Sequence, residues 1–206
     1  MTEQVRAAVV GNALMSFFPE VDKDMRERVQ TAMLFAQRAT RDVVDKGQVD
    51  DGYDYYRQQL RYLGWDAASP REAFDPDLER RSVREAMLGR IGAAAGPEYA
   101  EVTRWSIDTL GLSQPALFRF ERRSLESTSF QLLPCRVTRP GYVDMVLYHE
   151  VLKREEMGNG FLYRERTSTR VRAELVRFNA RLFEQQFGDK VRRSLLKVLE
   201  DELYEL

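Results

Sequence analysis

The chain is predicted to be an α+β protein: an N-terminal helical bundle of about five helices packed with a four-stranded antiparallel sheet and a C-terminal helix. In the first half, apolar residues recur every three or four positions, which is the period of a helix. After Gly111 they alternate with polar residues, which is the period of a strand. These patterns divide the chain into a helical region, 1–112, and a sheet with a C-terminal helix, 113–206. They leave open whether the two regions form one integrated domain.

The helical region is predicted from apolar spacing and from residues that end helices. The first helix follows Val5, Val9, Ala13 and Phe17 and stops at Pro19. A second begins after an aspartate cap, either Asp22 or Asp24, and ends at Gly47. A third runs from about residue 50 to a stop at Gly64. The remaining two are expected over 77–94 and 97–110.

The second region is predicted to contain strands and one last helix. Alternation predicts strands at 116–122 and 130–138, and Pro134 would place the second at an edge or a bulge because proline cannot donate to a ladder. Pro140 and Gly141 form a turn into a long hairpin. An amphipathic helix is expected over 189–204.

The long hairpin allows a prediction of its register. Its arms are 143–152 and 161–175, with a three-residue glycine-containing loop at 158–160. This loop pairs Leu147 with Val171 and sets Tyr148 opposite Arg170, so that one face is apolar and the other polar. Helical spacing beyond Val171 is the competing interpretation. The strand should therefore give way to helix between Leu175 and Asn179.

Four arginines are expected to share the polar face of this hairpin, with Tyr148 stacked beneath Arg170. Such a row is typical of binding to phosphates, to a nucleic-acid backbone or to anionic lipid headgroups. The alternative is an ordinary solvated face, partly neutralised by Asp144, Glu150 and Glu174. The arginines are Arg164, Arg166, Arg170 and Arg172.

The third predicted helix is rich in aromatic residues. Tyr56, Leu60 and Leu63 form its core-facing stripe, whereas Tyr55 and Tyr62 lie seven positions apart on another face. Tyrosine is favoured in cores and also at protein interfaces, so Tyr55 and Tyr62 are candidate interface residues.

Segment 55–65 has the pattern Tyr-Tyr-x-x-x-Leu-x-x-Leu-Gly-Trp. It resembles a stretch in small, largely uncharacterised bacterial proteins found beside pore-forming toxin genes. The resemblance covers this segment only and implies a bacterial accessory or virulence-associated protein, without assigning a role to any residue.

Residues suited to catalysis or metal binding are sparse, and no catalytic residue, metal site or cofactor is predicted. His149 is the single histidine and the matching zinc-motif position is Lys153, so a zinc-protease motif is rejected. Cys135 could pair with His149, but a buried structural thiol is the preferred interpretation. Asp50, Asp51 and Asp54 fit helix capping better than calcium binding.

Composition limits the functional classes further. The net charge of −1 argues against a polyanion-coating protein, although 1–112 carries −4 and 113–206 carries +3. A single cysteine gives no sign of an oxidising compartment, and neither a signal peptide nor a membrane helix is recognised. Cytoplasmic residence is the default expectation, with leaderless secretion as the alternative.

The favoured function is therefore a non-enzymatic protein-interaction or assembly component, toxin- or secretion-associated in a bacterium, with another protein as its partner. The second is a binder of an anionic ligand through the arginine face, and an enzyme is third. The sequence does not fix the oligomeric state.

Overall fold

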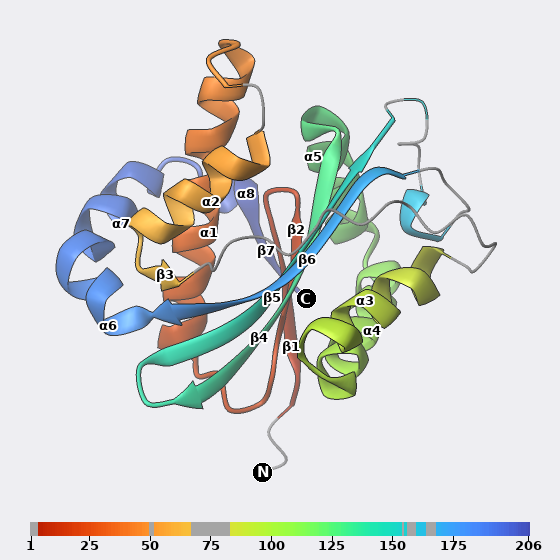
Figure 1. Cartoon of the computed structure of the whole chain (residues 1–206), viewed down its shortest axis with the longest axis horizontal. Helices are drawn as coiled ribbons and strands as arrows, with labels where there is room; N and C mark the ends of the chain where they lie inside the picture. The colour runs from red at the N-terminus through yellow and green to blue at the C-terminus, as the bar shows by residue number, and fades with distance from the viewer. Residues whose placement is uncertain (1–3, 50–51, 67–82, 154, 156–159, 164–167) are drawn as a thin grey trace.

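The fold is known from a computed structural model that describes residues 4–49, 52–66, 83–153, 155, 160–163 and 168–206. A mixed sheet of seven strands crosses it in the order β3-β6-β5-β4-β2-β1-β7 (Figure 1). Strands β2 and β4 are parallel, and the other described pairs are antiparallel. The strands are β1 (Arg6–Val10), β2 (Ala13–Phe17), β3 (Trp65–Asp66), β4 (Ser129–Arg139), β5 (Tyr142–Leu152), β6 (Ser168–Asn179) and β7 (Leu203–Glu205).

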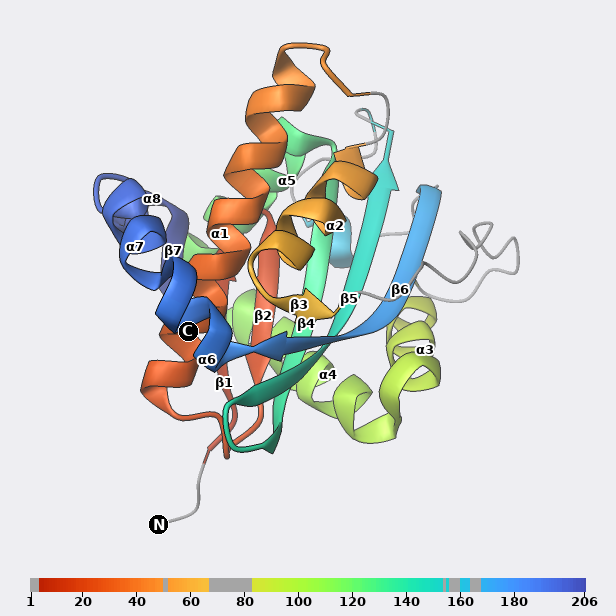
Figure 2. The same ribbon diagram turned by 60° about the vertical axis from the view of Figure 1, so that its left-hand side comes forward.

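Helices cover both faces of this sheet. The long helix α1 and the shorter α2 lie on one face, and α3, α4 and α5 lie on the other (Figures 1 and 2). The α+β class is confirmed, but the predicted four-stranded antiparallel sheet beside a helical bundle is wrong. The helices are α1 (Lys23–Asp45), α2 (Gly52–Tyr62), α3 (Val83–Ala95), α4 (Pro97–Leu112), α5 (Gln114–Ser127), α6 (Ala180–Phe183), α7 (Asp189–Leu195) and α8 (Leu199–Glu202).

Three of the predicted helices have the expected signals. Asp22 caps α1 by accepting a hydrogen bond from the backbone N–H of Met25 at 2.8 Å. Gly64, with a φ of +94°, follows α2, and Pro97 opens α4. The predicted helix 77–94 corresponds to α3 from Val83 onward, and its earlier residues lie outside the described part of the chain.

The N-terminal segment is a β-hairpin, so the helix predicted along Val5 to Phe17 is wrong. Val10 pairs with Ala13 across a two-residue turn, in which Gly11 has a φ of +56°. Both strands lie beneath helices on each side, and β2 is buried at every position. A strand buried on both faces has a continuous apolar sequence without period-two alternation, so spacing alone did not separate it from a helix.

The opposite error occurs at 116–122, which was predicted as a strand and belongs to α5. Its buried residues Ala116, Phe120 and Ser124 recur every four positions. The predicted strand put Phe118 and Phe120 on one face, but Phe118 is 62% exposed and Phe120 is fully buried, so the two do not share a buried face.

The predicted strand 130–138 is confirmed as β4. Pro134 led to two expectations for it, an edge position or a bulge, and the edge position is wrong; the register shift of the β4–β5 ladder lies between Val137 and Arg139 rather than at Pro134. Strand β4 lies in the middle of the sheet, between β2 and β5. Pro134 falls in an interval of the β4–β5 ladder, between the pairs Leu132–Tyr148 and Cys135–Met145. This interval accommodates a residue that has no N–H to donate.

The β4–β5 turn at Pro140 and Gly141 is confirmed, whereas the predicted register of the next hairpin is wrong. Leu147 pairs with Glu174 rather than Val171, and His149 pairs with Arg172. The register differs by three residues because β5 and β6 are not joined by a three-residue loop. Residues 161–163, predicted as strand, form a 3-10 turn. Strand β5 is also buried on both faces, so apolar parity could not select the register.

The end of β6 follows the sequence prediction. Asn179 is the last residue of the strand, and its side chain caps α6 by accepting a hydrogen bond from the backbone N–H of Leu182 at 3.0 Å. The single helix predicted at 189–204 is wrong, because the chain divides there into α7, α8 and β7. Strand β7 pairs with β1 and forms one edge of the sheet.

Glu202 anchors the C-terminal segment beside this edge. Its side chain is 3% exposed and faces three guanidinium groups, at 2.9 Å from Arg123, 3.7 Å from Arg41 and 3.9 Å from Arg38. Its backbone carbonyl accepts a hydrogen bond from Gly11. Across the described ranges, no helix combines the length and the apolar character that crossing a membrane would require.

Candidate ligand-binding cavity

A row of polar side chains crosses three neighbouring strands on the sheet face beneath α1 and α2. Gln131 of β4 pairs with His149 of β5, which pairs with Arg172 of β6. Paired residues on adjacent strands project from the same face. One step further along the strands, the same face carries Leu133 and Leu147, which are fully buried. The row therefore marks the point where an apolar core gives way to a polar cavity.

Helices α1 and α2 form the opposite wall of this cavity, which we call the His149 cavity. It has a volume of about 420 Å³, and its wall includes Gln37 and Arg41 of α1 and Tyr53 and Tyr56 of α2. Cavities of about 300–1,000 Å³ are usual for small-molecule ligands. The size of the His149 cavity therefore suits a small organic molecule.

Hydrogen bonds join the helices to the floor of the cavity. The Tyr56 hydroxyl donates to Oε1 of Gln131 at 3.2 Å, and Nε2 of Gln37 donates to the same oxygen at 3.3 Å. All three side chains are buried. Burial moves the pKa of Tyr56 still further above physiological pH, where its phenol is a neutral hydrogen-bond donor.

Tyr53 is held in place from three directions. Its ring lies 4.8 Å from the ring of His149, and the Arg172 guanidinium lies 4.3 Å from its centroid. Its hydroxyl donates to Glu174 at 2.5 Å, and Glu174 forms an ion pair with Arg57 at 2.7 Å. Burial, followed by the nearby Glu174 carboxylate, raises the pKa of Tyr53. This wall is therefore organised before a ligand arrives.

Among the described lining residues of the His149 cavity, cationic side chains outnumber carboxylates. Its lining includes three arginines, Arg41, Arg170 and Arg172, and two carboxylates, Asp45 and Glu126. Glu126 is already paired with Arg123 at 2.8 Å. Arg41 is one of three guanidinium groups around the single carboxylate of Glu202, so this neighbour does not reverse the positive balance.

Two of the four predicted arginines, Arg170 and Arg172, thus line one cavity. Arg164 and Arg166 lie outside the described residues. Tyr148 does not lie opposite Arg170: it pairs with Ala173 on the other face, where it is buried and donates to Glu150 at 2.6 Å. The three-residue difference in register is the reason.

The three carboxylates that were predicted to neutralise the arginines do not share one face of the sheet. Asp144 lies on the Tyr148 face and forms a two-point ion pair with Arg177, at 2.6 and 2.8 Å. Glu150 is on that face too, whereas Glu174 shares the face of Arg172. Neither Asp144 nor Glu150 therefore lies beside the arginines of the His149 cavity.

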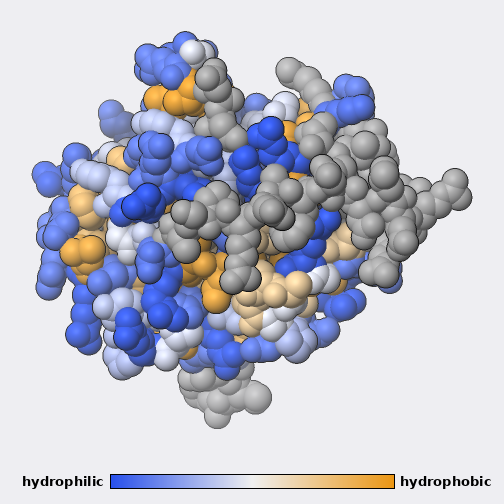
Figure 3. Space-filling model, viewed as in Figure 1, coloured by the Kyte–Doolittle hydropathy of each residue, from blue (hydrophilic) through white to orange (hydrophobic). Residues whose placement is uncertain are grey.

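The two candidate interface tyrosines differ in exposure. Tyr62 is 54% exposed and its ring lies 4.7 Å from that of Phe187, whereas Tyr55 is half-buried. On the molecular face in Figure 3, hydrophilic residues predominate and apolar residues form small separate groups. This view does not show one large apolar surface.

Cys135 and His149 are not brought together. Cys135 pairs with Met145, four residues along β5 from His149, which corresponds to about 13 Å at the usual rise of a strand. The Cys135 thiol is buried and donates to the carbonyl of Leu133 at 3.3 Å, and burial raises its pKa. His149 pairs with Arg172 of β6 on the other side of β5 from Gln131 of β4.

Metal ligands are likewise scattered within the described part of the chain, where no group of three histidine, cysteine or carboxylate side chains is arranged to hold an ion. Asp54 lies exposed in the first turn of α2. Asp50 and Asp51 lie outside the described residues.

Sequence reasoning missed four of the cavity residues: Gln37, Arg41, Tyr53 and Gln131. One signal was available for Gln37, because Gln30 and Gln37 lie seven positions apart within the buried stripe of α1. Amide side chains on a helix face that is otherwise apolar indicate a polar partner across the interface. The partner, Gln131, could be found only with the strand register.

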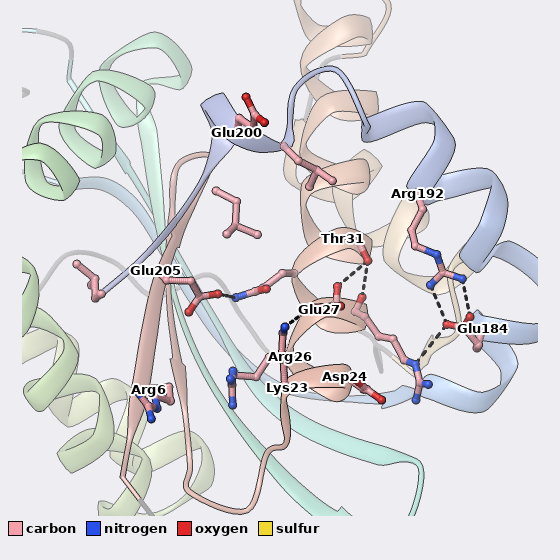
Figure 4. A pocket seen from close by; sticks show the side chains of 15 residues that line it. Arg6, Lys23, Asp24, Arg26, Glu27, Thr31, Glu184, Arg192, Glu200 and Glu205 are labelled. Atoms are coloured by element: carbon pink, nitrogen blue, oxygen red, sulfur yellow. Dashed lines mark hydrogen bonds and ion pairs between the residues drawn. The ribbon is translucent and has the colours of Figure 1, made fainter.

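A second and larger cavity lies between the first turns of α1 and the C-terminal segment, with a volume of about 930 Å³ (Figure 4). Its charged groups are matched to one another. Glu184 lies 2.6 Å from Arg192 and 3.3 Å from Arg28, and the hydrogen bond from Arg192 lowers the pKa of Glu184. Glu205 accepts a hydrogen bond from Gln30 at 2.8 Å. Since five cations and five carboxylates line this cavity, it shows no preference for an anion.

Comparisons with known proteins give little. No protein-family model matches the chain, and no curated protein matches it. Among solved structures it is similar to the Evf virulence factor, with 11% sequence identity and a TM-score of 0.32. The match covers 98% of this chain and 85% of that chain. At this TM-score the similarity carries no argument about function.

Proposed function

We propose that this protein binds a small anionic organic molecule in the His149 cavity. The convergence of Arg41, Arg170 and Arg172 on one cavity of ligand size is the observation that supports this proposal. Guanidinium groups bind phosphoryl and carboxylate groups through charge-assisted hydrogen bonds, which are stronger than neutral ones. The rigid Tyr53 wall holds Arg172 beside the cavity.

Isothermal titration calorimetry with pyrophosphate at low salt tests the proposal. Arg172→Met should weaken binding about 10- to 100-fold, because a hydrogen bond to a charged group contributes about 1.5–3 kcal/mol. Arg104→Met is the matched control, since Arg104 lies on α4 across the sheet and pairs there with Glu101. Equal affinities for the two variants, or no binding of millimolar pyrophosphate to the wild type, would refute this function.

Protein interaction through α2 is a second candidate function. The observation in its favour is Tyr62, a residue that is 54% exposed although its ring packs against Phe187. Exposed tyrosines are enriched at interfaces, where the ring supplies apolar area and the hydroxyl a hydrogen bond. Because segment 55–65 resembles a stretch of bacterial proteins found beside toxin genes, we propose that the partner is a toxin- or secretion-associated protein.

Native affinity purification tests this second function. A stoichiometric partner that is recovered with the wild type and lost with Tyr62→Glu would support it. Asp54→Lys, at another exposed position of α2, is the control for a general effect of charge. Recovery of the same partner with the wild type, Tyr62→Glu and Asp54→Lys would show that Tyr62 does not belong to the interface.

A further inference from the structure

The uncharged side chains of the His149 cavity indicate which organic group the ligand carries besides its anionic group. This inference rests on the proposed function, in which the cavity binds an anion. A phosphate ion would leave most of the 420 Å³ unfilled, because this volume equals that of roughly 14 waters in the liquid. The cavity is therefore large enough for an organic group beyond the anionic one. The side chains away from the arginines indicate which kind of group this is.

Gln131 is the most informative of these side chains. It is 3% exposed and lines the cavity between Tyr56 and His149. Its Oε1 already accepts two hydrogen bonds, from Tyr56 and Gln37, and these fix the orientation of the amide. In the part of the chain that the structure describes, Nε2 of Gln131 donates to no residue. A ligand oxygen in the cavity would accept from this group.

The aromatic residues of the cavity argue against a nucleobase. Tyr53 is already in contact with His149 and Arg172, and Tyr56 is 3% exposed. A flat base would need an open ring face on which to stack. Hydroxyl-bearing groups require only hydrogen-bond donors and acceptors, and Thr40, Ser127 and Ser129 also line the cavity.

From this geometry we infer that the ligand is a phosphorylated polyol, a small sugar phosphate. Its phosphoryl group lies against Arg170 and Arg172, and a hydroxyl or ring oxygen accepts from Nε2 of Gln131. The inference rests on the proposed function, because it names the ligand class of the same cavity. Gln131 is then the residue that distinguishes a sugar phosphate from inorganic phosphate.

Calorimetric titration of the full chain with ribose 5-phosphate, inorganic phosphate and AMP tests the inference. Ribose 5-phosphate should bind at least about 10-fold more tightly than inorganic phosphate, because it adds hydrogen bonds without adding charge. AMP should bind no more tightly than ribose 5-phosphate. In Gln131→Met the advantage of ribose 5-phosphate should fall about three- to tenfold, while the affinity for inorganic phosphate changes little.

Gln30→Met is the matched control, because Gln30 is 1% exposed and bonds to Glu205 in the second cavity. Equal affinities of the wild type for ribose 5-phosphate and inorganic phosphate would overturn the inference, but not the proposal that the cavity binds an anion. Tighter binding of AMP than of ribose 5-phosphate would overturn it in favour of a nucleobase site. Absence of binding by all three would overturn it together with the proposed function. If Gln131→Met does not fold, the wild-type comparison alone still decides.

Discussion

Glu174 links the wall of the His149 cavity to the sheet. Its carboxylate accepts from Tyr53 and pairs with Arg57, and both charged side chains are about one-tenth exposed. Removing the charge of a buried pair leaves the other charge without compensation in a medium of low polarity. The order of the cavity and the stability of the fold should therefore depend on the same residue.

Glu174→Gln should lower the free energy of unfolding by about 3 kcal/mol, since it leaves the Arg57 guanidinium buried beside a neutral amide. Urea unfolding followed by circular dichroism measures this change. Glu101→Gln removes a carboxylate that is 68% exposed and should change stability by less than about 0.5 kcal/mol. Similar values for the two variants would show that Glu174 is not a buried structural charge.

The buried thiol of Cys135 offers a second test at the residue scale. Burial raises its pKa, so at pH 8 the native state holds the neutral thiol, which is a poor nucleophile. Ellman's reagent should therefore label Cys135 slowly in the native protein and rapidly in urea. Rapid native labelling at pH 8 would place this residue at an accessible site.

Residues of the candidate site could be predicted only where their type alone was informative. Arg170 and Arg172 stood out because period-two spacing puts residues two apart on one face of any strand. Tyr148 was assigned to the wrong face, since its position relative to Arg170 depends on the register. Gln131 and Tyr53 become functional candidates only through contacts between distant segments.

At the scale of elements, the turn of the β1–β2 hairpin lies directly against the cavity wall. Gly11 has a φ of +56°, and a Cβ there would lie 2.1 Å from Oε1 of Gln37. Gly47, after α1, has a similar φ of +62°, but among the described residues no atom lies within 4 Å of the position that a Cβ would take there. A substitution at Gly47 therefore adds backbone strain alone, whereas the same substitution at Gly11 adds backbone strain and a clash with the cavity residue Gln37.

Gly11→Ala should be more destabilising than Gly47→Ala, measured by the shift in Tm. Both variants carry a left-handed backbone penalty of about 1–2 kcal/mol. Only Gly11→Ala must also displace Gln37, so it should additionally weaken ligand binding in the cavity. Equal shifts in Tm, with unchanged binding, would mean that Gln37 is not packed against the hairpin.

Elements with their own start and stop signals were predicted well. The aspartate cap of α1, the glycine after α2 and the proline of α4 act within a few residues of the helix that they delimit. The hairpin β1–β2 and helix α5 were misassigned because burial on both faces, or an exposed phenylalanine, altered the apparent period. Tertiary packing therefore overrode the local pattern in these two cases.

At the scale of the whole molecule, one sheet combines strands from both halves of the chain. The parallel pair of β2 and β4 joins the N-terminal hairpin to the long β4–β5–β6 meander, and β7 returns to β1. A sequence read locally cannot reveal such pairings, because they join segments that lie far apart along the chain. This arrangement leads us to propose that regions 1–112 and 113–206 form one cooperative unit.

Separately expressed 1–112 and 113–206 should therefore each remain largely unfolded, whereas the whole chain should unfold in one transition. Tryptophan fluorescence reports on Trp65 and Trp105, and far-ultraviolet circular dichroism reports on the whole backbone. The two urea midpoints should coincide for the intact protein. Native-like spectra for either fragment would show that the regions are independent domains.

A crystal structure of the protein in complex with pyrophosphate would show whether the His149 cavity is an anion-binding site. Phosphoryl oxygens should lie within hydrogen-bond distance of the guanidinium groups of Arg170 or Arg172, inside the His149 cavity, with Tyr53 still bonded to Glu174. Pyrophosphate bound in the second cavity or elsewhere on the surface, with none beside Arg172, would contradict the proposed anion site.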